Sequence, residues 1–127
     1  MRIFANLCLA LYEIHSKGVQ HRDLKPENIQ IHDLNGIDIY KITDFGISKY
    51  DKSTLKIDTT TGITGTLAYV SPERVKGNGN SLKEDIWALG VTLYHLAALE
   101  LPFKGDETAS RINSIMNDKP KALDDRS

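Results

Sequence analysis

The chain has little of what several classes of protein require. Its 127 residues include one cysteine, Cys8, which excludes an internal disulfide and a zinc site built on paired thiolates. The 16 Lys and Arg residues nearly balance the 17 Asp and Glu residues, which argues against broad electrostatic binding to nucleic acid or an anionic membrane. No apolar run approaches the ~20 residues of a membrane-spanning helix, so we expect a cytoplasmic or nuclear protein.

What is present is the composition of a folded domain. Hydrophobic residues make up 40% of the chain and charged residues 26%, proportions that are typical of globular proteins and not of disordered tails. A chain of this length can bury roughly two thirds of its unfolded surface, which is enough for one modest core. We therefore expect one domain and not a complete two-lobed enzyme.

Hydrophobic spacing predicts two well-marked helices. The first covers residues 1–17, where apolar residues recur at three- and four-residue steps before a stop at Gly18. The second follows a capping-box pattern formed by Ser81 and Glu84. Its sequence, DIWALGVTLYHLAAL, is apolar nearly all round, which predicts a buried helix that ends before Pro102.

The other segments are shorter or less regular. Alternating isoleucines flank Asn35-Gly36, which predicts a β-hairpin that ends near Thr43. Residues 44–72 are rich in Thr, Gly and Lys without periodicity, and are too long for an ordinary connection. Asp106 is expected to cap a last amphipathic helix, whose apolar residues are Ile112, Ile115 and Met116.

The predicted hairpin brings candidate metal ligands together. Antiparallel strands joined at Asn35-Gly36 place Asn28 beside Asp44. Mg²⁺ prefers oxygen donors and is commonly held by one or two protein groups plus substrate phosphates, so this pair suits a magnesium–nucleotide site. In the same loop, Asp23 can orient a hydroxyl and Lys25 can neutralise phosphate charge. The arrangement predicts phosphoryl transfer.

Four motifs in order resemble those of eukaryotic protein kinases. HRDLKPEN at 21–28 resembles the catalytic loop, DFG at 44–46 the metal loop, and GT…SPE at 65–73 the end of the activation segment. DIWALG at 85–90 resembles the buried helix of the kinase C-terminal lobe. The Lys25-Pro26-Glu27 insert resembles the serine/threonine type.

The resemblance implies a fold class and a division of the chain. We expect a mainly α structure, the helical C-terminal lobe of the protein kinase fold with a small β-hairpin, and with the N-terminal β lobe absent. Residues 1–127 would then form a partial kinase domain. Its parts would be the catalytic loop at 21–28, the activation segment at 44–73 and large-lobe helices at 83–117.

The resemblance also implies catalytic and cofactor-binding residues. Asp23 would orient the substrate hydroxyl and accept its proton, and Lys25 would contact the γ-phosphate. Asn28 and Asp44 would bind Mg²⁺. The nucleotide would be ATP, with Gln30 at the position under the adenine ring, where the family usually has an apolar residue.

Further roles follow for the activation segment. Arg22 would receive an activating phosphate, because its planar fork pairs with phosphate oxygens. Gly62 occupies the position where many family members carry the phosphosite, which leaves Thr61 or Thr64. Thr66 would contact the catalytic loop.

Two residues of the DIWALG motif are expected to be structural. Asp85 would brace the catalytic loop by accepting backbone N–H bonds, and Trp87 would pack beneath the activation segment. Three histidines, at positions 15, 32 and 95, lack the spacing of metal ligands and are expected to be surface or packed residues.

The predicted function is transfer of the γ-phosphate of ATP to Ser/Thr hydroxyls of proteins. The expected partners are a protein substrate and an upstream activating kinase, without nucleic acid or membrane. The alternative is a truncated, catalytically inactive, pseudokinase-like interaction module. No glycine-rich loop or small-lobe lysine precedes Met1, so the 127 residues alone are expected to be inactive.

Overall fold

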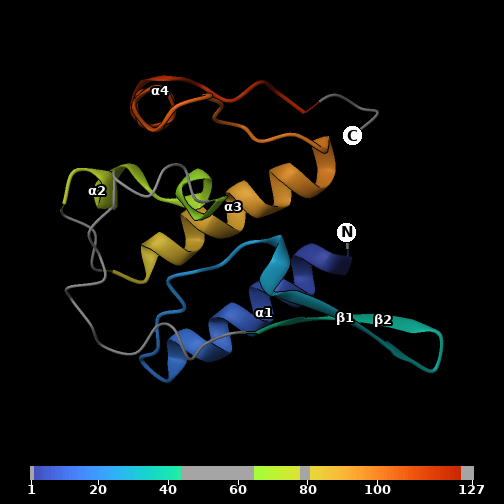
Figure 1. Ribbon diagram of the computed structural model, residues 1–127. Helices are drawn as coiled ribbons and strands as arrows, with labels where there is room; N and C mark the ends of the chain where they lie inside the picture. The colour runs from blue at the N-terminus through green and yellow to red at the C-terminus, as the bar shows by residue number, and fades with distance from the viewer. Residues whose placement is uncertain (1, 44–64, 78–80, 124–127) are drawn as a thin grey trace.

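The computed structural model describes residues 2–43, 65–77 and 81–123. Figure 1 shows α3 running through the middle of the molecule, with α1 on one side, α4 on the other, and the hairpin extending away from α1. The elements in chain order are α1 (Arg2–Ser16), η1 (Pro26–Asn28), β1 (Ile29–Leu34), β2 (Ile37–Ile42), η4 (Gly65–Tyr69), α2 (Pro72–Val75), α3 (Lys83–Ala98) and α4 (Thr108–Asn117).

The first helix confirms the spacing argument. α1 buries Leu7 and Leu11, two residues one turn apart on the same face, and it packs against β2. Gly18 follows with a φ of 73°, and its N–H donates to the carbonyl of His15 at 3.0 Å. A positive φ is cheap for glycine alone, so this residue ends the helix as predicted.

The hairpin also forms as predicted. β1 and β2 are antiparallel, with Ile29 opposite Ile42 and Leu34 opposite Ile37. The turn residues Asn35 and Gly36 have φ values of 54° and 83°, which is the left-handed geometry that a two-residue hairpin turn requires.

The start of α3 differs from the prediction. Leu82 occupies the N-cap position and makes no side-chain capping bond, while the hydroxyl of Ser81 accepts from the N–H of Lys83 at 3.2 Å. Glu84 does not complete a capping box with Ser81. It is 7% exposed, and its carboxylate instead accepts from the side chain of Gln20. Glu84 therefore binds Gln20, which is distant in sequence, and not the nearby Ser81.

The cap of the last helix lies one residue further on than expected. Glu107, and not Asp106, is the N-cap of α4 and forms a reciprocal capping box with Ser110. Both carboxylates could serve at a helix N-terminus; Ser110 supplies the partner that the capping box requires.

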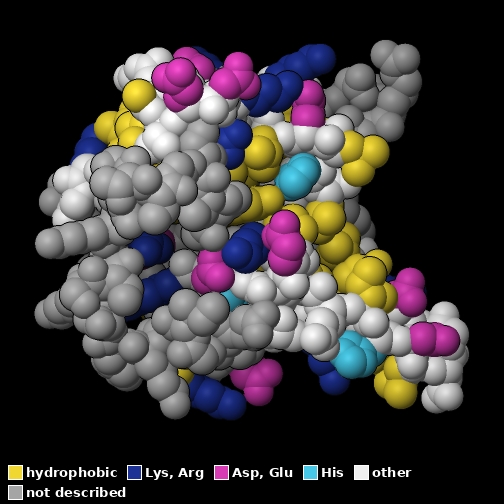
Figure 2. Space-filling model, in the orientation of Figure 1, with side chains coloured by type: hydrophobic (Ala, Val, Ile, Leu, Met, Phe, Trp, Pro, Cys, Tyr) yellow, Lys and Arg dark blue, Asp and Glu magenta, His cyan; other side chains and the backbone are white. Residues whose placement is uncertain are grey.

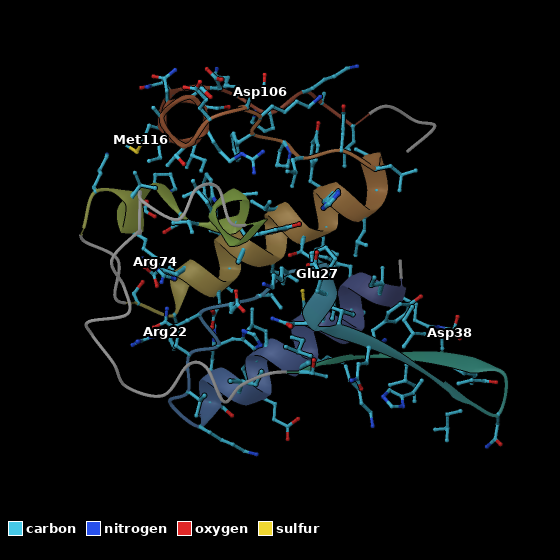
Figure 3. All side chains as sticks on the ribbon, in the orientation of Figure 1. Arg22, Glu27, Asp38, Arg74, Asp106 and Met116 are labelled. Carbon is cyan, nitrogen blue, oxygen red and sulfur yellow. The ribbon has the colours of Figure 1, made fainter. Side chains whose placement is uncertain are left out.

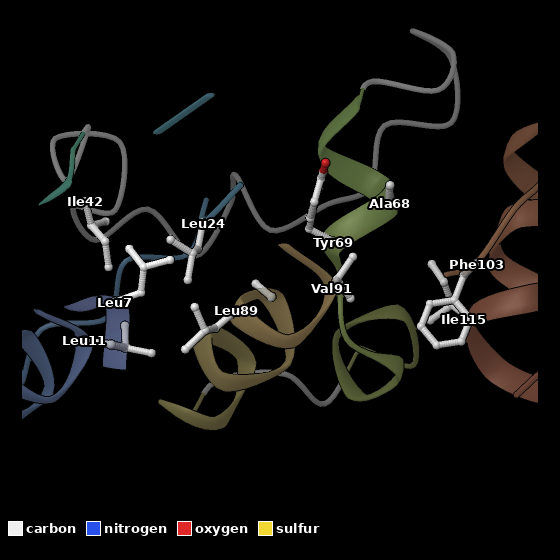
Figure 4. Close-up of a cluster of buried hydrophobic side chains, with 11 residues drawn as sticks. Leu7, Leu11, Leu24, Ile42, Ala68, Tyr69, Leu89, Val91, Phe103 and Ile115 are labelled. Carbon is white, nitrogen blue, oxygen red and sulfur yellow. The ribbon is translucent and has the colours of Figure 1, made fainter. Parts of the chain in front are cut away.

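The core lies between α1, the hairpin, η4 and α3, and Figure 4 shows these side chains converging from separate elements. Leu24, from the loop after α1, is 1% exposed, so this loop is anchored to the core. The buried cluster consists of Leu7, Leu11, Leu24, Ile42, Ala68, Tyr69, Ala88, Leu89, Val91, Phe103 and Ile115.

The predicted fold class requires a correction. We expected the helical C-terminal lobe of the kinase fold alone, with the N-terminal β lobe absent. The structure contains a β-hairpin that is followed by helices, and a sheet followed by a helix is also the order of elements in a kinase N-terminal lobe. The prediction that the chain is a C-terminal lobe fragment without a β lobe is therefore wrong.

The surface carries large apolar side chains. On α1, Phe4 is 52% exposed and Tyr12 74% exposed, and Figure 2 shows hydrophobic side chains in yellow over the start of this helix. Among the described residues, no helix has both the length and the apolar character needed to cross a membrane.

Candidate active site

A single buried carboxylate organises the loop that follows α1. Asp85, in the first turn of α3, is 1% exposed. Its Oδ2 accepts from the backbone N–H of His21 at 2.8 Å, and its Oδ1 accepts from the backbone N–H of Arg22 at 2.9 Å. These are the bonds to the loop backbone that the sequence predicted for Asp85.

His15 is a third partner that the sequence did not reveal. Its Nε2 lies 2.8 Å from Oδ2 of Asp85, so α1 is joined to α3 through the same carboxylate that holds the loop. The available signal was only the helical position of His15, which places it on the partly buried side of α1. A lone histidine carries no spacing pattern that marks such a contact.

Arg22 has a strained backbone that its neighbours hold in place. Its φ is 72°, in the left-handed region that costs a non-glycine residue on the order of 1–3 kcal/mol. Its N–H is bonded to Asp85, and its carbonyl accepts from Nη1 of Arg74 at 3.3 Å. Figure 3 shows Arg22 and Arg74 close together, although one comes from the loop and the other from α2.

His21 links this loop to the end of β2. Its side chain is fully buried, with Nδ1 accepting from the N–H of Asp23 at 3.1 Å and Nε2 lying 2.6 Å from the carbonyl of Thr43. A carbonyl can only accept, so Nε2 carries a hydrogen and Nδ1 carries none. The imidazole therefore fixes the loop relative to Thr43, the residue that precedes the DFG motif.

Three of the predicted catalytic residues lie together. Nζ of Lys25 is 3.6 Å from Oδ2 of Asp23, with side chains 24% and 15% exposed. Nδ2 of Asn28 donates to the carbonyl of Asp23 at 2.6 Å and lies 3.4 Å from the same Oδ2. The short helix η1 brings Asn28 back toward Asp23, because Pro26 fixes its first turn.

The sequence predicts that Asn28 lies beside Asp44, and the described residues show Asn28 next to Thr43, the residue before Asp44. The N–H of Thr43 donates to the carbonyl of Asn28 at 2.7 Å, so Asn28 lies opposite the residue before Asp44. Asp44 itself lies outside the described residues, as do Thr61 and Thr64. The backbone of Thr66 belongs to η4.

The described part of the site is compatible with a magnesium–nucleotide complex. Nδ2 of Asn28 is bonded to Asp23, which turns the amide oxygen, a hard donor of the kind Mg²⁺ prefers, away from that residue. No group of three His, Cys, Asp or Glu side chains suited to a metal exists within the part of the chain that the structure describes. A cation at Asn28 would therefore depend on Asp44 and on phosphate oxygens.

The predicted adenine-facing residue is on the hairpin. Gln30 is exposed on β1, and its Oε1 accepts from the ring of His32 at 3.1 Å. This contact of Gln30 is with a neighbour on its own strand.

Two aromatic residues fasten α3 to neighbouring segments. The hydroxyl of Tyr69 lies 2.9 Å from Nδ1 of His95, and burial, followed by the charge of Glu27, raises the pKa of Tyr69 to about 12. Trp87 stacks on Phe103 with ring centroids 5.5 Å apart. Tyr69 thereby joins η4 to α3, and Trp87 joins α3 to the chain that follows it.

The comparisons with known proteins agree with this site. The model of the protein kinase domain family matches residues 1–125, and the chain belongs to this family. Serine/threonine-protein kinase Nek8 of Danio rerio is 41% identical over 125 residues, which are 97% of this chain. Serine/threonine-protein kinase PknB of Mycobacterium leprae is 36% identical over 110 residues, or 87% of this chain.

A solved structure is similar as well. The crystal structure of the Rad53 kinase domain and SCD2 matches 91% of this chain and 38% of that chain, with a TM-score of 0.70 and 34% identity. The chain spans 17% of the length of Nek8 and 17% of that of PknB. The family match covers the described hairpin and helices together, which is why the chain is assigned to the kinase domain and not to one lobe of it.

Proposed function

We propose that this chain forms part of a serine/threonine protein kinase that transfers the γ-phosphate of ATP to Ser/Thr hydroxyls of protein substrates. One observation carries the proposal: the carboxylate of Asp23 lies between the ammonium of Lys25 and the amide of Asn28, at 3.6 and 3.4 Å from the same oxygen. The serine/threonine class is supported by the kinds of kinase to which the chain is similar.

Each residue has a task that its position allows. Asp23 orients the acceptor hydroxyl and takes up its proton as the oxygen attacks phosphorus. Lys25 offsets negative charge on the transferred phosphoryl group. Asn28 and Asp44 would hold Mg²⁺, which would supply positive charge to the phosphates of ATP when it is bound.

The remaining assignments are proposals at the edge of this site. Arg22 is proposed to receive a phosphate that an upstream kinase places on Thr61 or Thr64. Thr66 is proposed to contact the catalytic loop, and Gln30 to lie under the adenine ring. Gln30 is a polar residue at a position that the family usually fills with an apolar one, so adenine would gain less apolar contact there.

The test is Asp23→Asn in the complete kinase domain that contains this chain. An amide has nearly the shape of the carboxylate but accepts no proton, so radiolabel transfer to protein should fall by about 100- to 10,000-fold. Affinity for Mg-ATP should stay within about twofold, because Asp23 acts at the acceptor hydroxyl. The matched control is Asp38→Asn, an exposed position on β2, and transfer by Asp23→Asn at the control's rate contradicts the proposal.

A further inference from the structure

The side chain of Arg22 is held by a polar relay that reaches α3. Its Nε donates to Oε1 of Gln20 at 3.3 Å. Nε2 of Gln20 in turn donates to Oε2 of Glu84 at 2.6 Å. The guanidinium is therefore connected through one amide to a carboxylate in the first turn of α3.

The direction of the relay follows from its two ends. A guanidinium can only donate and a carboxylate can only accept, so a single orientation of the Gln20 amide satisfies both neighbours. In that orientation, the negative charge of Glu84 polarises the amide and makes its oxygen a better acceptor for Arg22. The hydrogen bond from Gln20 to Glu84, at 2.6 Å, therefore strengthens the hydrogen bond from Arg22 to Gln20, at 3.3 Å.

Burial makes the relay costly to break. Glu84 is 7% exposed, and its other oxygen, Oε1, is buried without a hydrogen-bond partner among the described residues. Nε of Arg74 is also buried without a hydrogen-bond partner among the described residues. Both side chains line a cavity of about 20 Å³ next to Arg22, which has room for about one water molecule. Among the described residues, the hydrogen bond to the Glu84 carboxylate therefore comes from Gln20.

We propose that Gln20 and Glu84 are positioning residues that fix the guanidinium of Arg22 from inside the protein. Asp85 and Arg74 hold the backbone of Arg22, while the relay holds its side chain. The orientation of Arg22 is then set without a phosphate on residues 44–64. The significance for activation rests on the proposed function, in which Arg22 receives that phosphate, whereas the relay itself does not depend on catalysis.

The test measures the Nε–H of Arg22 directly in the full chain by ¹⁵N NMR, with the signal assigned through its loss in Arg22→Lys. Gln20→Leu keeps a similar volume and removes both bonds, so hydrogen exchange at this Nε–H should become about tenfold faster, the effect of one lost bond to a charged group. Asn117→Leu removes an exposed amide on α4 and should leave the exchange rate unchanged.

An internal reference separates this effect from general loosening of the fold. The backbone N–H of His21 is bonded to Asp85 and reports the stability of the loop. The proposal requires the ratio of Arg22 Nε–H exchange to His21 N–H exchange to rise in Gln20→Leu, and an unchanged ratio overturns it.

A second variant covers the case in which Gln20→Leu does not fold. Glu84→Gln keeps the shape and one acceptor oxygen but removes the charge that polarises the relay, so the ratio should rise by a few-fold. A ratio within about twofold of the wild-type value in that variant also overturns the proposal. Because the measurement needs neither ATP nor substrate, a failure of the proposed kinase activity leaves its result unaffected.

Discussion

At the scale of single residues, the strongest dependence is on Asp85. Its carboxylate accepts from two backbone N–H groups and from His15, so Asp85→Ala would leave buried donors without partners. We expect a loss of about 3–5 kcal/mol in the free energy of unfolding, measured by urea denaturation. Asp38→Ala, on the exposed side of β2, is the control and should change stability by less than about 0.5 kcal/mol. Equal effects of the two substitutions would contradict the role given to Asp85.

Tyr69 predicts a response to alkaline pH. Burial, the main cause, and the charge of Glu27 raise the pKa of its hydroxyl to about 12, whereas in the unfolded chain it ionises near its ordinary value of 10. The folded state therefore binds more protons between these values, so stability is complete below pH 10 and is lost as the pH rises toward 12.

The measurement compares the pH dependence of unfolding in the wild type and in Tyr69→Phe. The variant lacks the ionising group, so the difference in stability between the two proteins should shrink as the pH rises through this range. A difference that stays constant over that range would show that the hydroxyl ionises equally in both states.

At the scale of elements, two glycines in different conformations give a matched pair of substitutions. Gly36 has a φ of 83° in the hairpin turn, and Gly90 lies in α3 without a left-handed φ; a Cβ would meet nothing within 4 Å at either position. Gly36→Ala should destabilise the fold by about 1–2 kcal/mol because of its φ. Gly90→Ala should stabilise it by about 0.5–1 kcal/mol, since alanine is the better helix former. Thermal unfolding measures the stability of both variants. Effects of the same sign would contradict the backbone conformations given to Gly36 and Gly90.

Local sequence signals predicted the elements well where a single residue type decides the geometry. Gly18 ends α1 and Asn35-Gly36 forms the hairpin turn, because few other residues accept a positive φ. The caps were less predictable. Glu84 could satisfy either Ser81 or Gln20, and only the packed structure decides that Gln20 wins.

The candidate site was predictable in part for the same reason. The HRDLKPEN pattern places Asp23, Lys25 and Asn28 in one loop, and they do lie together. The bond between His15 and Asp85 joins residues 70 positions apart, and no local pattern encodes it. The fold class was stated too narrowly, because motif order does not decide which lobe the described elements represent.

At the scale of the whole molecule, an open apolar groove should be detectable. Between α1 and β2 it measures about 560 Å³, within the range of small-molecule sites, and its apolar lining includes Ile14, Val19, Tyr40 and Ile42. We expect the native chain to bind the fluorescent probe ANS there.

Substitution of a residue at the groove tests this expectation. Val19 is 41% exposed, so Val19→Lys should not disturb the core and should reduce ANS fluorescence, because it replaces part of the apolar lining of the groove. Ile37→Lys makes a similar change at a residue 50% exposed on the hairpin and away from the groove. An equal reduction in both variants would mean that the probe binds exposed apolar surface in general.

The role of Asp85 has a consequence for the order of events during synthesis. The backbone N–H groups of His21 and Arg22 reach their carboxylate partner across 64 and 63 positions of sequence. When α1 and the hairpin segment have left the ribosome, the carboxylate of Asp85 that bonds the backbone of Arg22 has not yet been made. Only when the start of α3 emerges can that loop form its bonds to Asp85, so the residues proposed to carry the chemistry are made before the segment that sets them in place.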